Sequence, residues 1–315
     1  MAEKGIKLHG RLLSRLLFCV VAAISSSETQ AKGLSLALGG SQVKQETFSL
    51  FAVPGEILSL DLIDYDTSKL NIRFEGVEIK PPATGIWRFS APLESGLYSF
   101  ELEYPDGGEA TTLNVFVGTV LTPQQESLEG YRIGPVPSGH SENPQLYRSP
   151  RLYVRVTREM LNIPLSDHFT LGQFLCKQES TFPKYLALSE ELLVLLEGLV
   201  GAVQRAGYPI ETFGIISGYR TPYYNSLIGN VAASRHVYGD ALDFYVDVNK
   251  DGLMDDLDGD GDSDRKDIDM LFDIVEDYRQ HAGYDGPPGG IGRYYKTSRH
   301  SGFVHVDTRG YRARW

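Results

Sequence analysis

The chain has 315 residues, which is enough for two ordinary domains or for a catalytic domain with an accessory module. Its apolar content of 42% is typical of a globular protein, and its formal net charge of −11 argues against a nucleic-acid-binding surface. No apolar run in the middle of the chain is long enough to span a membrane. The acidity is local, because residues 247–269 hold ten Asp and only three basic residues.

Residues 1–31 have the pattern of a secretory signal peptide. Four basic residues precede the apolar run 16–24, and small and polar residues follow it as far as Ala31. We expect cleavage near Ala31 and no transmembrane span in the mature protein. The alternative is an uncleaved membrane anchor, for which this apolar run is short.

Residues 33–120 alternate apolar and polar positions between turn signals such as Val53-Pro-Gly and Pro105-Asp-Gly-Gly. Several short strands at this spacing, without a helical pattern, predict a small β-sandwich of immunoglobulin-like type. It carries no evident chemical constellation, so we interpret it as an accessory module that acts as a spacer or docking unit. Residues 121–168 form a connector rich in Pro, Gly and Tyr, which we expect to lie along the next domain.

Residues 169–315 predict an α+β domain. Thr170 and Gln173 have the capping-box spacing that opens a helix. A longer helix begins at Ser189, presents a wide apolar face and ends at Gly207. Buried strands are expected at 213–217, 241–246 and 302–307, and helices before and between strands indicate a mixed fold.

Two histidines and a carboxylate in this domain have the chemistry of a zinc site. His236 precedes Asp243 by seven residues, with a glycine between them, and His305 lies on a later strand. Imidazole and carboxylate are good ligands for Zn²⁺, and catalytic sites commonly combine three protein ligands with water. Side chains alternate along a strand, so His305 and Asp307 share one face. A single His in a strand is more often an ordinary core or surface residue, so the spacing alone is weak evidence.

The acidic segment 247–269 follows the spacing of a calcium-binding loop, with Gly252 and Gly261 at the sharp turns. Two overlapping registers share residues, so they predict one compact turn that resembles the calcium segments of dockerin-like or thrombospondin repeats. The alternative is a solvated acidic loop, in which so many carboxylates would repel one another without a cation. The predicted calcium ligands are Asp247, Asn249, Asp251, Asp255, Asp256, Asp258, Asp260, Asp262, Asp264 and Asp267.

Three motifs together resemble the signature of the M15 peptidases. They are Ser217-Gly-Tyr-Arg-Thr-Pro with Asn225, then Ser234-x-His-x-x-Gly-x-Ala-x-Asp243, and finally the late histidine. This family contains zinc D-Ala-D-Ala carboxypeptidases and murein endopeptidases and shares its fold with the hedgehog signalling domain. The resemblance covers about residues 165–315. The ending 302–308 with Arg314-Trp315 is most similar to the periplasmic murein endopeptidase branch.

The resemblance implies roles for individual residues. His236, Asp243 and His305 would bind zinc, and Arg220 would face the substrate, unless it forms only a structural salt bridge. His300 corresponds to an active-site histidine of the carboxypeptidases. Many members carry an acidic or second histidine residue just before the last ligand, where this chain has Gly302-Phe-Val304. His300 and Asp307 are therefore both candidates for the general base.

Tyr219 and Asn225 complete the predicted site, as residues that shape the turn or contact substrate. The expected activity is zinc-assisted hydrolysis of peptide bonds in peptidoglycan stem peptides or crosslinks by a secreted protein, either periplasmic or associated with the cell wall. One alternative is a non-catalytic zinc-containing binding module of the same fold. Another assigns the main function to the β-sandwich, as an adhesin or wall anchor. The sequence specifies no oligomeric state.

Overall fold

The protein is described here by a computed structural model, which covers residues 33–38, 41–63, 65–80, 85–105, 108–122, 124–138, 144–281 and 284–315. The predicted signal peptide lies outside these residues. Within the described part of the chain, no helix combines the length and the apolar character that a membrane crossing requires.

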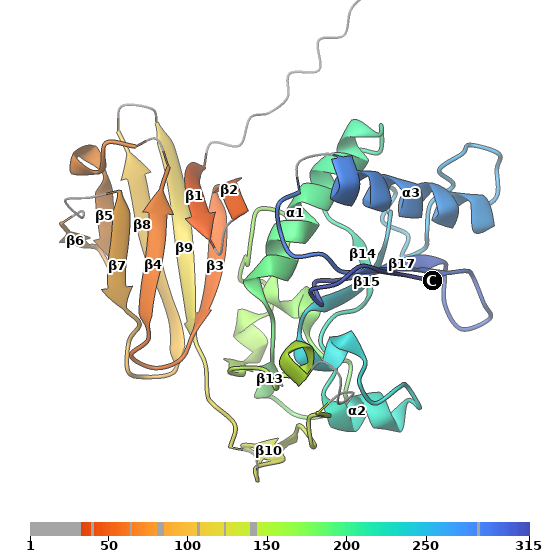
Figure 1. The fold of residues 1–315 in the computed structure, drawn as a ribbon, viewed down its shortest axis with the longest axis horizontal. Helices are drawn as coiled ribbons and strands as arrows, with labels where there is room; N and C mark the ends of the chain where they lie inside the picture. The colour runs from red at the N-terminus through yellow and green to blue at the C-terminus, as the bar shows by residue number, and fades with distance from the viewer. Residues whose placement is uncertain are drawn as a thin grey trace, which may run out of the picture. The chain divides into compact units, whose positions relative to one another are not determined.

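The N-terminal part consists of two β-sheets (Figure 1). The first sheet has the order β2-β1-β4-β7, and the second has the order β3-β9-β8-β5-β6, in which β3 and β9 run parallel. The strands are β1 (Leu34–Leu38), β2 (Ser41–Gln45), β3 (Thr47–Ala52), β4 (Ile57–Leu62), β5 (Asn71–Phe74), β6 (Val77–Ile79), β7 (Ile86–Ser90), β8 (Gly96–Tyr104) and β9 (Glu109–Val117), with a short 3-10 helix η1 (Thr67–Lys69) before β5.

The two sheets share one hydrophobic core, because alternate residues of each strand point toward the other sheet. Leu60 and Trp87 come from the first sheet and Phe48, Phe100 and Leu113 from the second, and all five are buried in the same cluster. Trp87 packs edge-to-face on Phe100 at a centroid distance of 5.5 Å, which links the two sheets through an aromatic contact.

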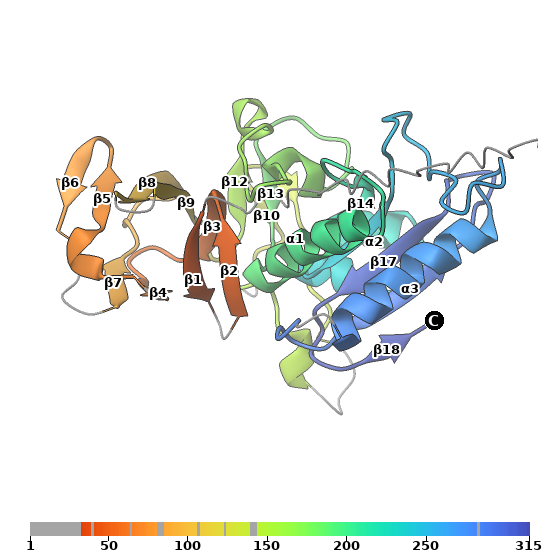
Figure 2. The ribbon, with the colours of Figure 1, turned by 90° about the horizontal axis from the view of Figure 1, so that it is seen from above.

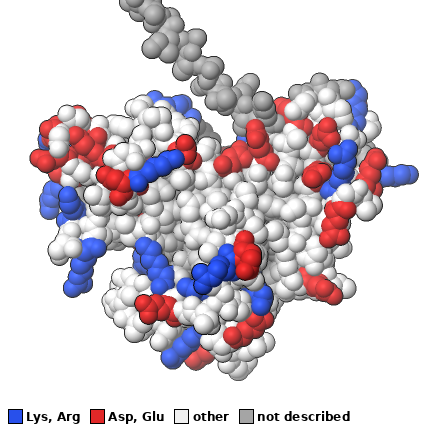
Figure 3. Space-filling model, turned by 180° about the vertical axis from the view of Figure 1, so that it is seen from behind, with Lys and Arg blue, Asp and Glu red and all other residues white. Residues whose placement is uncertain are grey.

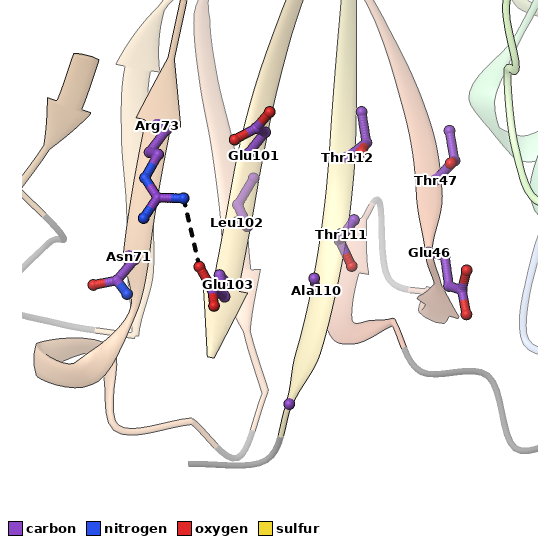
Figure 4. Close-up of a pocket in the computed structure, with 11 residues that line it drawn as sticks. Glu46, Thr47, Asn71, Arg73, Glu101, Leu102, Glu103, Ala110, Thr111 and Thr112 are labelled. Atoms are coloured by element: carbon purple, nitrogen blue, oxygen red, sulfur yellow. Dashed lines mark ion pairs between the residues drawn. The ribbon is translucent and has the colours of Figure 1, made fainter. Parts of the chain in front are cut away.

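Charged side chains of both signs lie at the surface of the protein (Figure 3). On the face shown in Figure 3, acidic and basic side chains are interspersed. A hollow of about 490 Å³ lies on the outer face of the second sheet, where Arg73 and Glu103 form an ion pair at 3.6 Å (Figure 4). Thr47 and Thr112 stand side by side on β3 and β9 in the same hollow. This face therefore offers hydrogen-bonding groups, and no aromatic side chain is among those described as lining it.

The connecting segment packs onto the C-terminal part. Tyr131, Ile133 and Tyr153 are buried in the core cluster that contains helix α1 (Glu190–Arg205). The regular elements of this segment and of the chain that follows it are β10 (Ser127–Leu128), β11 (Tyr131–Arg132), η2 (Pro144–Tyr147), β12 (Val154–Val156), η3 (Arg158–Met160), η4 (Leu171–Phe174) and β13 (Lys184–Leu186).

The C-terminal part is built on a five-stranded sheet of order β14-β15-β17-β16-β18, antiparallel except for the last pair. Its strands are β14 (Gly214–Ser217), β15 (Ala241–Tyr245), β16 (Gly290–Tyr294), β17 (Phe303–Asp307) and β18 (Ala313–Arg314). The helices are α1, α2 (Pro222–Leu227), η5 (Arg235–Tyr238) and α3 (Arg265–His281). Three of these strands, β14, β15 and β17, correspond to the predicted ones.

Helices α1 and α3 lie side by side against this sheet (Figure 2). Ser189 caps α1 by accepting a hydrogen bond from the Leu192 N–H at 3.2 Å, and seven apolar residues of the helix are buried. The helix ends before Gly207, which has a φ of +105°. The helix predicted to open at Thr170 is only a short 3-10 helix: the capping box is present, but η4 ends at Phe174, and the C-cap residue Leu175 has an extended ψ of 138°.

Alternation along β15 and β17 separates the core from the opposite face of the sheet. Leu242 and Val306, a cross-strand pair, belong to the same core cluster as α1 and α3. Asp243 and His305, the adjacent pair, therefore point to the other face. The sheet thus separates the helical core from the polar residues predicted to bind a metal.

Side-chain carboxylates of the C-terminal part accept hydrogen bonds from backbone N–H groups of β3. Asp167 Oδ1 accepts from Thr47 at 2.7 Å, and Glu190 Oε1 accepts from Phe51 at 2.8 Å. Burial raises the pKa of Glu190 to about 7, and the Phe51 N–H offsets this only in part. The ionised form of Glu190 is therefore destabilised by the folded structure.

We predict that Glu190→Gln stabilises the protein at alkaline pH. Because the folded state raises this pKa above the ordinary value of a glutamate, folded wild type loses stability as the pH rises through about 7. The amide keeps an acceptor for Phe51 without the charge, so we expect a gain on the order of 1–2 kcal/mol at about pH 8.5 and little change at about pH 5.

Thermal unfolding at the two pH values measures this difference. The matched control is Glu191→Gln, which removes an exposed carboxylate at the next position of the same helix. An equal effect of both variants at alkaline pH, or a loss of stability specific to Glu190→Gln, would contradict the assignment.

Candidate metal centre

Asp243 and His305 face each other across two antiparallel strands. They form a direct cross-strand pair of β15 and β17, and Asp243 Oδ1 lies 2.8 Å from His305 Nδ1. Both side chains are buried. His236 completes the cluster, with its Nε2 atom 3.1 Å from the same Asp243 oxygen. The structure thus brings together the three residues that the sequence separates by up to 69 positions.

His236 is placed by a short 3-10 helix and a glycine. It lies in η5, and Gly239 follows in the left-handed conformation with a φ of +77°. A Cβ atom at Gly239 would lie 2.5 Å from the carbonyl oxygen of Ala187, so only glycine fits between η5 and β15. The close approach returns the chain directly into β15, which carries Asp243.

Hydrogen bonds on the outer side of each imidazole fix its orientation. His236 Nδ1 lies 2.7 Å from the carbonyl oxygen of Gly218, so this nitrogen donates and Nε2 faces the cluster. His305 Nε2 lies 3.0 Å from Asp307 Oδ2, which leaves Nδ1 facing Asp243. Such outer partners orient metal-binding histidines and fix their tautomers.

Asp307 itself is fully buried and its oxygens are already engaged. Oδ1 accepts from the Gly290 N–H at 2.9 Å and from Arg309 Nε at 2.8 Å, while Oδ2 accepts from Arg309 Nη2 at 2.5 Å. Arg309 and His305 therefore neutralise this carboxylate from two sides. The structure places Asp307 behind His305 rather than at an open face of the cluster.

Arg220 pairs with the second oxygen of Asp243. Its Nη2 donates to Asp243 Oδ2 at 2.6 Å, and its Nε donates to Ser217 Oγ at 2.7 Å. Ser217 and Asp243 are cross-strand neighbours on β14 and β15, so the sheet register holds the arginine in place. The predicted salt-bridge role of Arg220 is thus present, and its side chain also lines the cleft described below.

The electrostatics keep the cluster in a mixed protonation state. Burial lowers the pKa of His236, which outweighs the attraction of Asp243. Burial alone would also lower the pKa of His305, yet the carboxylates of Asp243 and Asp307 raise it to about 9. Although burial opposes ionisation of Asp243, the two histidines hold its pKa well below the usual range. A buried carboxylate that stays ionised is suited to a cation.

The cluster opens into a cleft of about 600 Å³. Asp243 is the only carboxylate among the described residues that line it. His300 lines the same cleft, and its Nδ1 lies 2.7 Å from the Ser301 carbonyl oxygen, which leaves Nε2 available. The other lining residues are Ile216, Arg220, Asn230, Val231, Ala233, Ser234, His236, Tyr294, Phe303, His305, Arg309 and Trp315.

Three predicted site residues do not line this cleft. Asp307 is held behind His305, so it is placed to orient that imidazole instead of acting as a base on substrate. Tyr219 is 1% exposed and packs edge-to-face on Tyr153 in the core. Asn225 is also buried, and its Nδ2 donates to the Val231 carbonyl oxygen at 2.9 Å, so it shapes the turn after α2.

The structure adds residues that spacing had not indicated. Tyr294, Phe303 and Trp315 line the cleft from β16, β17 and the residue after β18. The alternation of β17 was available from the sequence and places Phe303 on the same face as His305. Tyr294 was not predicted because β16 was not, and Trp315 entered the sequence analysis only through the resemblance of the chain's ending, without a role in the site.

The acidic segment folds into two successive turns closed by its own carboxylates. Asp247 Oδ2 accepts from the Gly252 N–H at 3.1 Å, and Asp256 Oδ2 accepts from the Gly261 N–H at 2.7 Å. Oxygens of Asp256, Asp258 and Asp260 lie within 4.8 Å of one another. Asp267 is fully buried and accepts backbone hydrogen bonds from Leu257, Asp258 and Asp264. No cation is described here, and calcium remains a prediction.

The donor set of His236, Asp243 and His305 fits zinc. It offers two imidazole nitrogens and one carboxylate oxygen within 4.8 Å, with the other nitrogen of each ring hydrogen-bonded outward. Ligands at about 2.0–2.1 Å from a tetrahedral zinc lie roughly 3.3 Å apart, and the pairs here lie 2.8 and 3.1 Å apart. A catalytic zinc site keeps a further position open, and this cluster faces a cleft.

Comparison with known families identifies part of this domain. Residues 167–257 match the family model described as Peptidase M15. The match contains His236 and Asp243, whereas His305 lies beyond it and joins the cluster through the register of β15 and β17. Neither the curated proteins nor the solved structures contain a match to this chain.

We predict that Asp307→Asn weakens metal binding without abolishing the fold. The amide cannot hold His305 and Arg309 as an ionised carboxylate does, and loss of such an outer partner typically costs about 10- to 100-fold in metal affinity. Competition with a chromophoric chelator measures the affinity for zinc.

The matched control is Asp240→Asn. Asp240 forms a buried ion pair with Arg235 and is not a partner of His305. Both variants lose a buried charge pair, so a comparable loss of thermal stability is expected from each. The assignment fails if the two variants bind zinc with the same affinity.

Proposed function

We propose that this protein is a secreted zinc-dependent peptidase that hydrolyses peptide bonds in peptidoglycan stem peptides or crosslinks. The observation that carries the proposal is the buried cluster of His236, Asp243 and His305, which opens into a cleft beside a region that matches the M15 peptidases. The three-motif resemblance to murein peptidases supports the choice of substrate. The secretory pattern of residues 1–31 supports a periplasmic or wall-associated location.

The residues around the cluster have separable tasks. His236 Nε2, Asp243 Oδ1 and His305 Nδ1 would hold the zinc, which supplies a nucleophilic water at neutral pH and polarises the scissile carbonyl. Asp307 orients His305, and Gly218 orients His236 through its carbonyl oxygen. Arg220 holds the second oxygen of Asp243 and borders the cleft, where its remaining N–H groups can stabilise negative charge on a substrate.

His300 is the residue best placed to move a proton. Apart from the three residues of the cluster, the titratable side chains among the described residues of the cleft lining are His300, Tyr294, Arg220 and Arg309. The Nδ1 atom of His300 is engaged by the Ser301 carbonyl, so Nε2 can accept a proton from the attacking water and return one to the leaving amine. This assignment replaces Asp307, whose oxygens are saturated.

The peptidase proposal predicts close to one zinc per chain and hydrolysis of purified muropeptides. His236→Ala and His305→Ala each remove a ligand, so both should lose the metal and at least about a thousandfold in rate. His300→Ala should keep the metal and lose about 10²- to 10⁴-fold in turnover, as expected for a proton-transfer group.

Metal content by atomic emission and product analysis by mass spectrometry separate these effects. Asn225→Ala removes no side chain of the cleft lining but breaks the hydrogen bond to Val231 in the loop beside it, so it serves as a control for local folding. If both metal-ligand variants left wall-peptide hydrolysis intact, the mechanism would be wrong.

A non-catalytic zinc-containing binding module is the second candidate. The observation in its favour is that no carboxylate except Asp243 is described in the cleft lining. This candidate predicts zinc at one per chain and saturable binding of muropeptides without new products. If wild type releases a product from muropeptides and His300→Ala does not, the binding-module candidate is excluded.

We also propose that the segment 247–269 binds structural calcium. Its two overlapping registers support this, as does the proximity of Asp256, Asp258 and Asp260. Asp267 joins the segment to α3, and Leu257 of the same segment packs in the core, so an ion here would order a connection between β15 and α3.

Calcium added to the zinc-loaded protein should therefore raise the melting temperature. Saturation at about 100 times the dissociation constant corresponds to about 2.7 kcal/mol of added stability. Asp256→Asn and Asp260→Asn should reduce the shift. Asp269→Asn, which removes a half-buried carboxylate outside both registers, should not reduce it. A melting temperature that does not respond to calcium refutes the proposal.

A further inference from the structure

An unbroken set of aromatic contacts connects His305 to His300, two of the three histidines that line the cleft. The Trp315 ring lies 5.3 Å from His305 between ring centroids, and its Nε1–H donates to Tyr294 Oη at 2.8 Å. Tyr294 stacks on Phe303 at 4.7 Å with an interplanar angle of 6°, and Phe303 meets His300 edge-on at 5.1 Å. We call Trp315 and Tyr294, the two exposed members, the aromatic wall.

The backbone of β16 is shaped to accept the indole. A Cβ atom at Gly292 would lie 2.4 Å from Trp315 Nε1, and one at Gly290 would lie 3.0 Å from the far edge of the ring. Both glycines therefore leave room for Trp315 to lie flat against the strand. The backbone of Trp315 adds two hydrogen bonds to β16, at 3.3 Å to Ile291 O and 3.0 Å from the Arg293 N–H. The position of Trp315 is thus fixed by its two backbone hydrogen bonds, by the hydrogen bond from its indole N–H and by the close approach of its ring to β16.

The Trp315 ring lines the cleft, where the Arg309 guanidinium carbon lies over it at 5.2 Å from the ring centroid. Trp315 is 45% exposed and Tyr294 is 37% exposed, although both side chains are apolar over most of their surface. Val231, on the loop after α2, lines the same cleft and is 76% exposed. An exposed aromatic side chain that is already held in place favours contact with an apolar group. The contact removes aromatic surface from water, and the aromatic side chain loses little further conformational entropy.

We propose that the aromatic wall binds the aliphatic side chain of the residue next to the scissile bond and so determines substrate specificity. The proposal rests on the peptidase function proposed above. It deepens that function by assigning the preference for alanyl over glycyl peptides to Trp315 and Tyr294. These residues contact substrate, and they leave the zinc cluster and His300 to carry out the reaction.

Hydrolysis of two stem peptides tests the preference with the full-length, zinc-loaded protein. The peptides differ only in alanine or glycine beside the scissile bond. One methyl group in an apolar pocket is worth roughly tenfold or more, so wild type should favour the alanyl peptide by about tenfold in kcat/KM. Trp315→Ala should reduce this ratio to about twofold, chiefly through KM, because it removes the indole of the wall and leaves the proton-transfer group in place.

Two further variants separate substrate contact from structural damage. Trp315→Phe keeps an aromatic face and should retain most of the preference. Leu93→Ala removes a side chain that is 81% exposed and does not line the cleft, so it should behave as wild type. All variants should bind close to one zinc. An unchanged alanine preference in zinc-loaded Trp315→Ala overturns the proposal.

Fluorescence distinguishes failure of the wall from failure of the peptidase function. Trp87 is buried in the N-terminal core, so it contributes a constant background in wild type and in Trp315→Phe. Saturable quenching by the alanyl peptide in wild type only, without hydrolysis, would support the wall and refute catalysis. Hydrolysis with no quenching difference between the two proteins would refute the wall and support catalysis.

Discussion

The pairing of Asp243 with His305 across two strands is the interaction on which the rest of the site depends. A carboxylate buried on a sheet face is costly unless it is paired and hydrogen-bonded. Asp243 meets this requirement with His236, His305 and Arg220. His305 in turn requires Asp307, and Asp307 requires Arg309. Each buried charge has an opposite partner, so removing one member leaves another uncompensated, and the effects of substitutions here will not be additive.

These pairings constrain the backbone around them. Gly290 must lack a side chain, because a Cβ atom there would lie 2.4 Å from Asp307 Oδ2. Its N–H also donates to that carboxylate, so the strand approaches closely enough to satisfy an otherwise buried charge. Arg279 of α3 donates to the backbone oxygen of Asp307 at 2.7 Å, which connects the helical layer to the site. The geometry of the His236, Asp243 and His305 cluster is thus maintained by elements on both faces of the sheet.

The sequence predicted the parts of the fold that have strong local patterns. The apolar face of α1 and the runs of β15 and β17 are long enough to specify burial, and alternation placed His305 and Asp307 on one face. Alternation does not say which residue stands in front of the other, so the position of Asp307 behind His305 needed the structure. Strand β16 begins Gly-Ile-Gly and has no strand-like sequence pattern. Its two glycines lower the β-propensity of the segment, but they leave room for the side chains of Asp307 and Trp315. Because β16 was not predicted, the sequence could not place Tyr294 beside Trp315.

The N-terminal sheets are better explained as a support than as a freely tethered module. Asp167 and Glu190 accept backbone hydrogen bonds from β3, and Phe51 and Phe116 are buried in the core cluster of the C-terminal part. Within the described residues, the cleft lining includes none from 33–120. The candidate metal cluster therefore lies in the C-terminal part, while β3 donates a hydrogen bond to Glu190 at the start of α1. Helix α1 packs against α3, and Arg279 of α3 donates a hydrogen bond to the backbone of Asp307. Loss of the β3 contacts is therefore expected to disturb the cluster of His236, Asp243 and His305 through these two helices.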